Sequence, residues 1–182
     1  TMEQKTNNSM LSKNKILKLA RVVKTPAYIY DLSSIKARVK ELTNIKYDTK
    51  YYAATMSNFN PKLLKMYKEN QLGVFVNSEM HFELAKKCGF SGKQIIWTSS
   101  GMTKGQIIKA YKEGIILNLD SNGQLELYGS MFPNSKVGIR VNIIDMPNNE
   151  TYAGAFVGPK SRIGIIPSEF AETNRIAKKY NI

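Results

Sequence analysis

KYYAATMSNFNP, at Lys50–Pro61, is the stretch from which the fold of this chain can be predicted. Its first part, Tyr51–Met56, is apolar on both faces apart from Thr55, which is typical of a parallel strand covered on both sides. Asn60 is an N-cap residue type, and Pro61 suits the first position of a helix. The stretch therefore predicts a buried strand, a polar turn and a helix. In a parallel α/β protein, chemistry lies at the carboxyl end of such a strand.

The same strand-and-helix pattern repeats along the chain about every 20 residues, the length of successive βα units. Glycines mark three of the expected helix ends, because Gly73, Gly89 and Gly114 each follow a helical run, as C-cap glycines do. Strands that alternate with helices at this spacing predict an α/β protein with a parallel sheet or barrel. Strands are expected near residues 50–56, 73–78, 94–99, 114–120 and 136–142, with helices near 61–70, 79–88, 103–113 and 122–131.

The N-terminal part departs from this repeat. It predicts a short helix at residues 10–21, followed by a strand at Ala27–Tyr30 that has no obvious partner in the chain. Asp31 and Ser33 are both N-cap residue types, so one of them is expected to begin the next helix.

The C-terminal part is expected to stop short of a closed barrel. The sequence predicts a loop rich in Gly, Asn and Pro at residues 143–159 and one more helix at 167–180, with no sixth strand. The chain has 182 residues, whereas a closed eight-stranded barrel needs about 250. An open array exposes strand edges. The chain is therefore expected to be a fragment, to form a homo-oligomer, or to need another polypeptide that completes its core.

Composition and charge argue against several classes of protein. The net charge is +13, from 27 Lys+Arg and 14 Asp+Glu, but the lysines are scattered over helix faces, so no nucleic-acid partner is expected. No run of about 18 apolar residues is present, so no membrane association is predicted. The polar N-terminus lacks the apolar core of a signal peptide. The single cysteine, Cys88, excludes an internal disulfide and a multi-cysteine metal site, and a cytoplasmic location is expected.

Several short motifs, in a consistent order, resemble one enzyme family. They are TPAYIYD at Thr25–Asp31, the strand and turn at Tyr52–Pro61, GVFVNS at Gly73–Ser78, LDS at Leu119–Ser121, RVN at Arg140–Asn142 and SRIG at Ser161–Gly164. They are similar to the pyridoxal-phosphate-dependent diaminopimelate, ornithine and arginine decarboxylases, which have the alanine-racemase-type barrel. The resemblance implies a parallel (β/α) TIM-barrel-type array of about five βα units, an incomplete barrel over residues 25–182 after an N-terminal polar and helical extension at 1–24.

The resemblance also implies a lyase of amino-acid metabolism, a dimer that uses pyridoxal phosphate on a basic or dicarboxylic amino acid. In the family pattern the first barrel strand ends in the lysine that forms the Schiff base with the cofactor, and here Met56 stands at that position. A thioether cannot form an imine. Lys50 begins the same strand, at the wrong end of the barrel, and Lys62 is expected to point from the next helix into solvent. No catalytic residue is therefore assigned.

Two more positions depart from the family pattern. The acid of the second strand is replaced by Phe75, and the glutamate that follows that strand is replaced by His81. His81 is the only histidine. It lies in the first turn of a helix, where it either reaches the mouth of the pocket or, as is more common for such a histidine, is a partly exposed surface residue.

The predicted site lies where the strands end, around Met56. By resemblance and position, the expected cofactor-binding residues are Asn58, Ser78 and Arg140, and the expected substrate-pocket residues are His81, Ser99 and Asp120. No metal ligands are assigned.

Arg140 offers a bidentate fork to an anionic ligand, or else pairs with Asp120 or Asp145. Tyr152 and Phe156 belong to the loop and are expected to line a pocket or a subunit interface. Two functions remain open. One is a pyridoxal-phosphate-dependent decarboxylase, and the other is a non-catalytic relative that binds a small anionic ligand or a partner protein.

Overall fold

The structure is a computed structural model, and it describes residues 11–143, residue 158 and residues 161–182. The chain divides into two compact units, Thr1–Tyr51 and Tyr52–Ile182, which are described separately. Within the described residues, no helix is long and apolar enough to cross a membrane. Those residues also hold no group of three or more His, Cys, Asp or Glu side chains that could bind a metal ion.

The first unit contains two helices, α1 (Lys13–Val22) and α2 (Leu32–Thr43). The Asp31 carboxylate caps α2 by accepting hydrogen bonds from the backbone N–H groups of Ser33 and Ser34, so Asp31 is the predicted cap that forms. The strand predicted at Ala27–Tyr30 is absent, because these residues pair with no other described strand. A single strand gains no ladder of hydrogen bonds, and its apolar tyrosines alone do not stabilise it.

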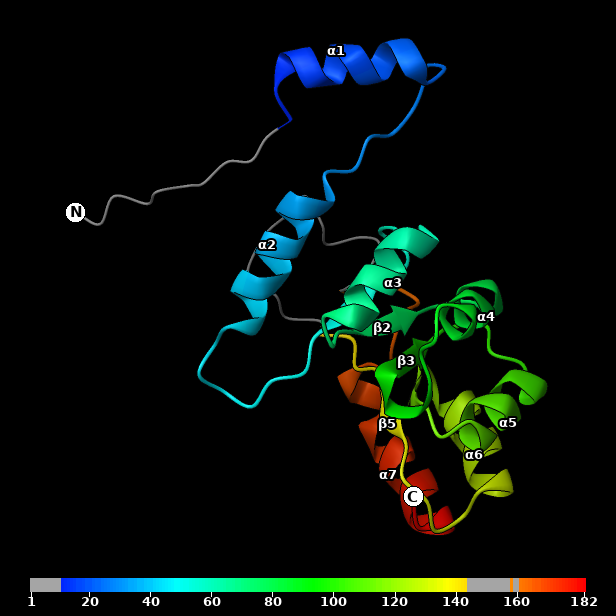
Figure 1. Cartoon of the computed structure of the whole chain (residues 1–182). Helices are drawn as coiled ribbons and strands as arrows, with labels where there is room; N and C mark the ends of the chain where they lie inside the picture. Colours follow the sequence, from blue (N-terminus) through cyan, green and yellow to red (C-terminus); the bar gives the residue numbers. More distant parts are fainter. Residues whose placement is uncertain (1–10, 144–157, 159–160) are drawn as a thin grey trace. The chain divides into compact units, whose positions relative to one another are not determined.

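The second unit is a parallel sheet in which the strands follow one another in sequence order (Figure 1). Its strands are β1 (Tyr52–Ala54), β2 (Gly73–Val76), β3 (Ile95–Thr98), β4 (Ile116–Leu119) and β5 (Gly138–Ile139). Its helices are α3 (Pro61–Glu69), α4 (Glu79–Lys87), α5 (Lys104–Lys112), α6 (Asn122–Met131) and α7 (Phe170–Tyr180), with the short 3-10 helices η1 (Gly92–Gln94) and η2 (Pro167–Glu169). The parallel βα order predicted from the sequence is confirmed, with shorter strands.

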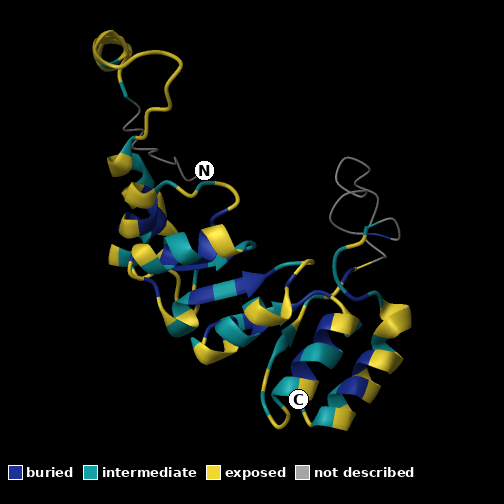
Figure 2. Ribbon diagram, turned by 90° about the vertical axis from the view of Figure 1, so that its right-hand side faces the viewer, coloured by how far each residue is buried: buried dark blue, intermediate teal, exposed yellow. Residues whose placement is uncertain are grey.

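One face of the sheet packs against the helices and forms the core, shown dark blue in Figure 2. Along each strand alternate residues point to this face, as Val74 and Val76 do from β2. Trp97 of β3 stacks on Phe82 of α4, with ring centroids 4.9 Å apart. Most residues of the opposite parity, among them Phe75, are only partly buried, while Gly73 and Thr98 are buried. The second face of the sheet therefore lacks a comparable layer within the described residues.

The glycine predictions need one correction. Gly89 and Gly114 follow their helices with φ of 90° and 63°, as predicted. Gly73 is instead the first residue of β2, and Gln71 takes the left-handed conformation after α3, with φ of 63°. A Cβ at Gly73 would lie 2.4 Å from the Tyr52 ring. Gly73 is therefore explained by a close approach of two strands rather than by a helix end.

The end of the sheet agrees with the prediction that no sixth strand follows, because the sheet of the described residues has five strands. Val141 and Ile165 form only an isolated parallel bridge beyond β5. The backbone N–H of Ile165 donates to the carbonyl of Arg140 at 2.8 Å, and the N–H of Asn142 donates to the carbonyl of Ile165 at 2.9 Å. The position after β5 is thus occupied by a single residue pair. The sequence around Ile165 is too short to read as a strand.

Candidate functional site at the carboxyl ends of the strands

A cavity of about 310 Å³ lies at the carboxyl ends of the strands. Its lining comes from segments that follow or end β1, β2, β3 and β5, and it consists of Met56, Phe75, Asn77, Thr98, Ser99, Ser100, Gly101, Arg140 and Ile163. Parallel strands bring their carboxyl ends to one edge of the sheet, so these residues meet although they are far apart in sequence. Of the residues expected at the site, the cavity brings together Met56, Ser99 and Arg140.

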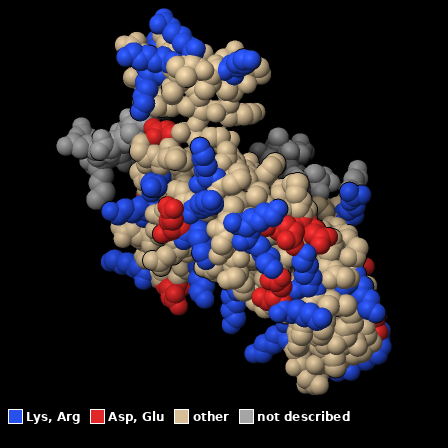
Figure 3. Space-filling view, turned by 45° about the vertical axis from the view of Figure 1, so that its right-hand side comes forward, with Lys and Arg blue, Asp and Glu red and all other residues tan. Residues whose placement is uncertain are grey.

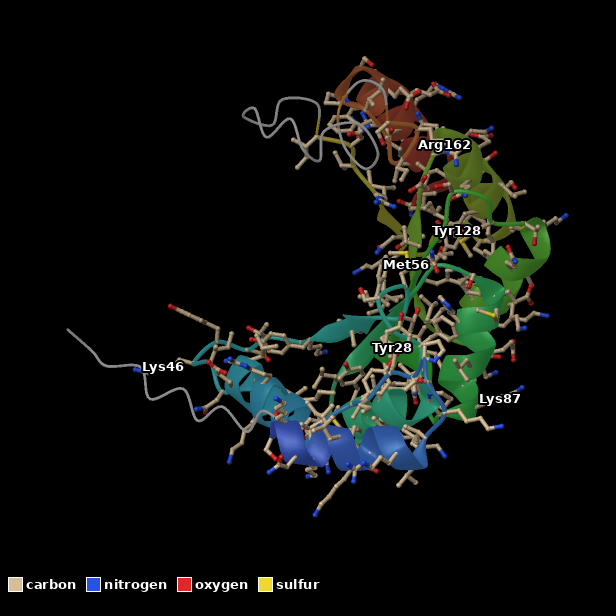
Figure 4. The ribbon with its side chains drawn as sticks, turned by 90° about the horizontal axis from the view of Figure 1, so that it is seen from above. Tyr28, Lys46, Met56, Lys87, Tyr128 and Arg162 are labelled. Carbon is tan, nitrogen blue, oxygen red and sulfur yellow. The ribbon has the colours of Figure 1, made fainter. Side chains whose placement is uncertain are left out.

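Met56 lies in the turn directly after β1, and its side chain is 54% exposed. Figure 4 labels it beside the strands rather than among helices α4–α6, whereas the labelled Lys87 extends outward from α4. The backbone of Thr55, one residue earlier, still follows the ladder, with its N–H donating to the carbonyl of Phe75 at 2.9 Å. The position that the resemblance gives to the family's lysine thus lies at the cavity, and it carries a thioether.

Arg140 follows β5 and is one of the residues that line the cavity. Its Nη1 atom lies 3.5 Å from Oδ1 of Asp120, a side chain that is only 2% exposed. Of the two predicted partners, Asp120 is therefore the one seen, while Asp145 lies outside the described residues. Oδ1 of Asp120 accepts no hydrogen bond from the described residues, so the pair is an ion pair without a direct hydrogen bond. The Arg140 donors remain available to a ligand.

Asn58, Ser78 and His81 do not line the cavity. Asn58 Oδ1 accepts from the backbone N–H of Asn60 at 2.9 Å. Ser78 caps α4 and accepts from the N–H of His81 at 3.3 Å. Both side chains thus make local hydrogen bonds where the chain leaves a strand and enters a helix.

His81 was expected to be partly exposed, and this is wrong because the residue is only 8% exposed. Its Nδ1 lies 3.0 Å from Thr55 Oγ1 and 3.1 Å from Asn77 Oδ1, and its ring packs on Phe59 with centroids 5.0 Å apart. The Thr55 hydroxyl donates to the Phe75 carbonyl at 3.0 Å. His81 Nδ1 is therefore the donor to both oxygen atoms. The histidine joins the end of β1 to the end of β2 through these hydrogen bonds.

Sequence reasoning missed two residues of this region. Gln124 of α6 is buried, and its Nε2 donates to the carbonyl of Ser99 at 2.9 Å while its Oε1 accepts from the N–H of Asp120 at 2.8 Å. It therefore ties the end of β3 to the end of β4. Thr98 lines the cavity, and its Oγ1 is buried with no hydrogen-bond partner in the described residues. A polar residue in the last position of an apolar strand was the signal for Thr98.

Cys88 is buried, and desolvation raises the pKa of its thiol, while the nearby Lys65 acts in the opposite direction. A protonated thiol is a poor nucleophile. Cys88 is accordingly a packing residue at the end of α4, as its sequence position indicated. Tyr152 and Phe156, expected to line a pocket or an interface, lie outside the described residues.

A family model described as "Pyridoxal-dependent decarboxylase, pyridoxal binding domain" matches residues 32–182. The chain belongs to this family. The family description agrees with the predicted cofactor, pyridoxal phosphate, and with the predicted class of decarboxylase-like lyases.

Curated relatives carry decarboxylase names. The chain is 28% identical over 166 residues to diaminopimelate decarboxylase of Aquifex aeolicus, covering 88% of this chain and 39% of the relative. It is 30% identical over 106 residues to L-glutamyl-[BtrI acyl-carrier protein] decarboxylase of Niallia circulans, covering 58% of this chain and 25% of the relative. The chain thus spans well under half the length of both relatives.

Solved structures of the family share the fold. A crystal structure of diaminopimelate decarboxylase superposes with a TM-score of 0.81 at 19% identity, covering 97% of this chain and 42% of that one. The diaminopimelate decarboxylase of Helicobacter pylori complexed with L-lysine gives a TM-score of 0.74 at 23% identity, over 91% of this chain and 43% of that one. The predicted barrel-type βα array is therefore confirmed.

The chemistry of the cavity lining decides whether the family's cofactor can be held there as an imine. An internal imine needs a primary amine, and no lysine is among the described residues that line the cavity. Lys50 and Lys62, the two lysines nearest in sequence, are exposed and lie outside the lining. The residues present therefore do not fit covalent attachment of pyridoxal phosphate. A guanidinium and several hydroxyl groups fit an anion held without a covalent bond.

Proposed function

We propose that the cavity binds a small anionic ligand non-covalently and that this chain does not hold pyridoxal phosphate as an imine. The observation that carries the proposal is the side chain of Met56, which is half exposed and borders the cavity at the position that the resemblance gives to the Schiff-base lysine. A carbonyl cofactor needs an amine to be anchored as an imine, and a thioether is not one. Decarboxylation through such an anchored imine is accordingly not proposed for this chain.

Arg140 supports the anionic character of the ligand. Arg140 lines the cavity, and its Nη1 atom lies 3.5 Å from Oδ1 of the buried Asp120. Because this Oδ1 accepts no hydrogen bond from the described residues, the guanidinium keeps its donors for a ligand. A planar guanidinium recognises carboxylate and phosphate groups through paired hydrogen bonds. Ser99 contributes to the wall of the cavity. The role proposed for Asn58, Ser78 and His81 is to support the neighbouring backbone through hydrogen bonds, outside the lining.

The test is incubation with pyridoxal phosphate, borohydride reduction and peptide mapping by mass spectrometry, on the wild type and on Met56→Lys. We expect no adduct on the wild-type peptide that contains residue 56, and an adduct at residue 56 in the variant. Surface lysines provide the background level, with the peptide of the exposed Lys62 as the internal control. A wild-type adduct that exceeds this background, at any lysine, would show that the chain anchors the cofactor after all.

We further propose that another polypeptide, either a second copy of this chain or a completing segment, covers the apolar residues next to β5. Ile139, Val141 and Ile143 are 38%, 44% and 54% exposed, which supports a missing packing layer at this edge. Sedimentation equilibrium tests this, with a homo-oligomer as the expected result. Binding of the cavity ligand to a stable monomer would remove the need for the second copy.

A reducing, cytoplasmic setting is also proposed, and the single free cysteine, Cys88, supports it. The name of the matched Helicobacter pylori structure includes L-lysine, so an amino-acid ligand is the family-based alternative. Competition between an amino acid and a simple carboxylate for the cavity distinguishes an amino-acid ligand from the proposed small anionic ligand.

A further inference from the structure

The charges that face the cavity are unbalanced. Among the described residues that line it, Arg140 is the one charged side chain, and no Asp or Glu is present. The carboxylate of Asp120, which is not part of this lining, is 2% exposed and already lies 3.5 Å from the Arg140 guanidinium. Among the described residues, the cavity therefore offers a site for negative charge and no exposed partner for positive charge.

An ammonium group would be poorly accommodated here. It would leave water for a wall without a carboxylate, and an unpaired charge that is removed from water is costly. It would also lie near the Arg140 guanidinium, which has the same sign. Neutral oxygen atoms from Ser99, Ser100 and Asn77 can accept hydrogen bonds from an ammonium, but they do not cancel its charge.

Three apolar side chains also line the cavity. Met56, Phe75 and Ile163 come from three separate segments and border the same space. Met56 and Phe75 occupy the positions where the resemblance places a lysine and an acid. With Met56 and Phe75 in place of the lysine and the acid, the wall has lost one charge of each sign and is suited to a hydrocarbon group. Apolar surface that leaves water on binding gains about 25 cal/mol per Å².

We infer that the ligand is an anion with an apolar body and no ammonium group, such as a branched carboxylate. Its negative group binds Arg140, and its apolar body packs on Met56, Phe75 and Ile163. This inference rests on the proposed function, because it specifies the ligand of the same cavity. The inferred ligand differs from an amino acid with the same side chain in one group only, the ammonium.

A matched set of three probes tests the inference by isothermal titration calorimetry on the 182-residue chain at pH 7. The probes are 4-methylpentanoate, leucine, which is the same acid with an ammonium group, and acetate, which has the anion without the body. We expect 4-methylpentanoate to bind at least tenfold more tightly than either of the others. Leucine binding as tightly as 4-methylpentanoate, or more tightly, overturns the inference. Acetate binding equally tightly removes the role of the apolar wall.

A pair of variants separates charge from size. Phe75→Asp adds a carboxylate to the wall, and Phe75→Asn adds a side chain of nearly the same shape without charge. We expect Phe75→Asp to raise the affinity for leucine relative to 4-methylpentanoate at least tenfold, and Phe75→Asn to leave that ratio within threefold of the wild type. Circular dichroism checks that both variants fold. An unchanged ratio in a folded Phe75→Asp protein counts against the inference.

The site of binding is read from methionine methyl groups by NMR. Signals of Met56 should shift on addition of 4-methylpentanoate, while those of Met102, which is buried at 7% exposure outside the cavity lining, serve as the control.

The two proposals can fail separately. If both 4-methylpentanoate and leucine bind equally and depend on Arg140, the proposed function stands and the inference falls. If no probe binds, or binding ignores Arg140, the proposed function falls and the inference with it.

Discussion

Arg140 Nη1 lies 3.5 Å from Asp120 Oδ1, and the two residues directly follow the neighbouring strands β5 and β4. The strands are in register here, since the N–H of Arg140 donates to the carbonyl of Leu119 at 2.8 Å. Asp120 is almost fully buried, whereas the Arg140 side chain is 37% exposed. The buried carboxylate therefore holds one end of the guanidinium, while the Arg140 side chain stays partly accessible at the cavity that it lines.

Arg140→Ala should weaken the binding of 4-methylpentanoate by about 1.5–3 kcal/mol, the usual contribution of a hydrogen bond to a charged group. Calorimetric titration of both proteins measures the difference. Arg162→Ala is the control, because Arg162 is exposed and is not among the described residues that line the cavity. Equal losses in the two variants would point to a general effect of net charge rather than to a specific contact.

His81→Phe should lower the free energy of unfolding by about 1–3 kcal/mol, because it leaves Asn77 Oδ1 without the Nδ1 donor now 3.1 Å away. His81→Asn retains a donor near the Nδ1 position and should lose less. Urea denaturation of the three proteins gives the comparison. A Phe variant as stable as the wild type would mean that packing on Phe59 outweighs both hydrogen bonds.

Gly129→Ala should destabilise the contact between α6 and α7. A Cβ at Gly129 would lie 2.4 Å from the Tyr180 ring, and forcing extra atoms into a packed contact costs about 1–3 kcal/mol. Gly123→Ala in the same helix is the matched control, because its nearest neighbour would be Ser121 Oγ at 3.9 Å. That control should be neutral or more stable by about 0.4–1 kcal/mol. Thermal unfolding of both variants decides the point, and destabilisation by Gly123→Ala as well would contradict it.

The link between α4 and α5 should depend on pH. Hydrogen bonds from Gln106 and from Lys109, both 3.2 Å long, lower the pKa of Glu79 below its usual value of 4.5. The pKa of Lys109 is raised above 10.5 by its hydrogen bonds to Glu83 and Glu79. A carboxyl whose pKa is lowered on folding contributes stability above its unfolded pKa, and loses it as the pH falls through the folded value. A lysine whose pKa is raised contributes below 10.5 and loses its contribution as the pH rises through the higher folded value.

Glu79→Gln tests the acidic side of this dependence. The variant should unfold at a lower urea concentration than the wild type at pH 7, and the difference should shrink as the pH falls below 4.5. Lys112→Gln, on an exposed residue of α5, controls for a simple change of net charge. Figure 3 shows Lys and Arg side chains spread over the face in view with Asp and Glu among them, so one charge changes the overall field little. A difference that persists unchanged at pH 3 would exclude the carboxylate as its source.

The sequence by itself determined the order of the βα units. Apolar runs, the Asn60 cap with Pro61, and the glycines at Gly89 and Gly114 all act within a few residues, so the helices and strands of the second unit could be located without knowing their neighbours. That Met56 stands where the family pattern has its lysine is likewise a matter of residue type, and the loss of imine formation stays a prediction. The family resemblance identified position 56 as that of the Schiff-base lysine, and the chemistry of a thioether gave the prediction that no imine forms there.

Only the tertiary structure decided which polar residues form the site. Asn58 and Ser78 had the right residue types, but their oxygen atoms are used by backbone N–H groups two or three residues away. Two predictions were wrong for a related reason, the strand at Ala27–Tyr30 and the partly exposed position of His81. Strand pairing and burial both depend on partners far away in sequence. The cavity exists because parallel strands bring Met56, Thr98 and Arg140 to one edge, a relationship that no local pattern encodes.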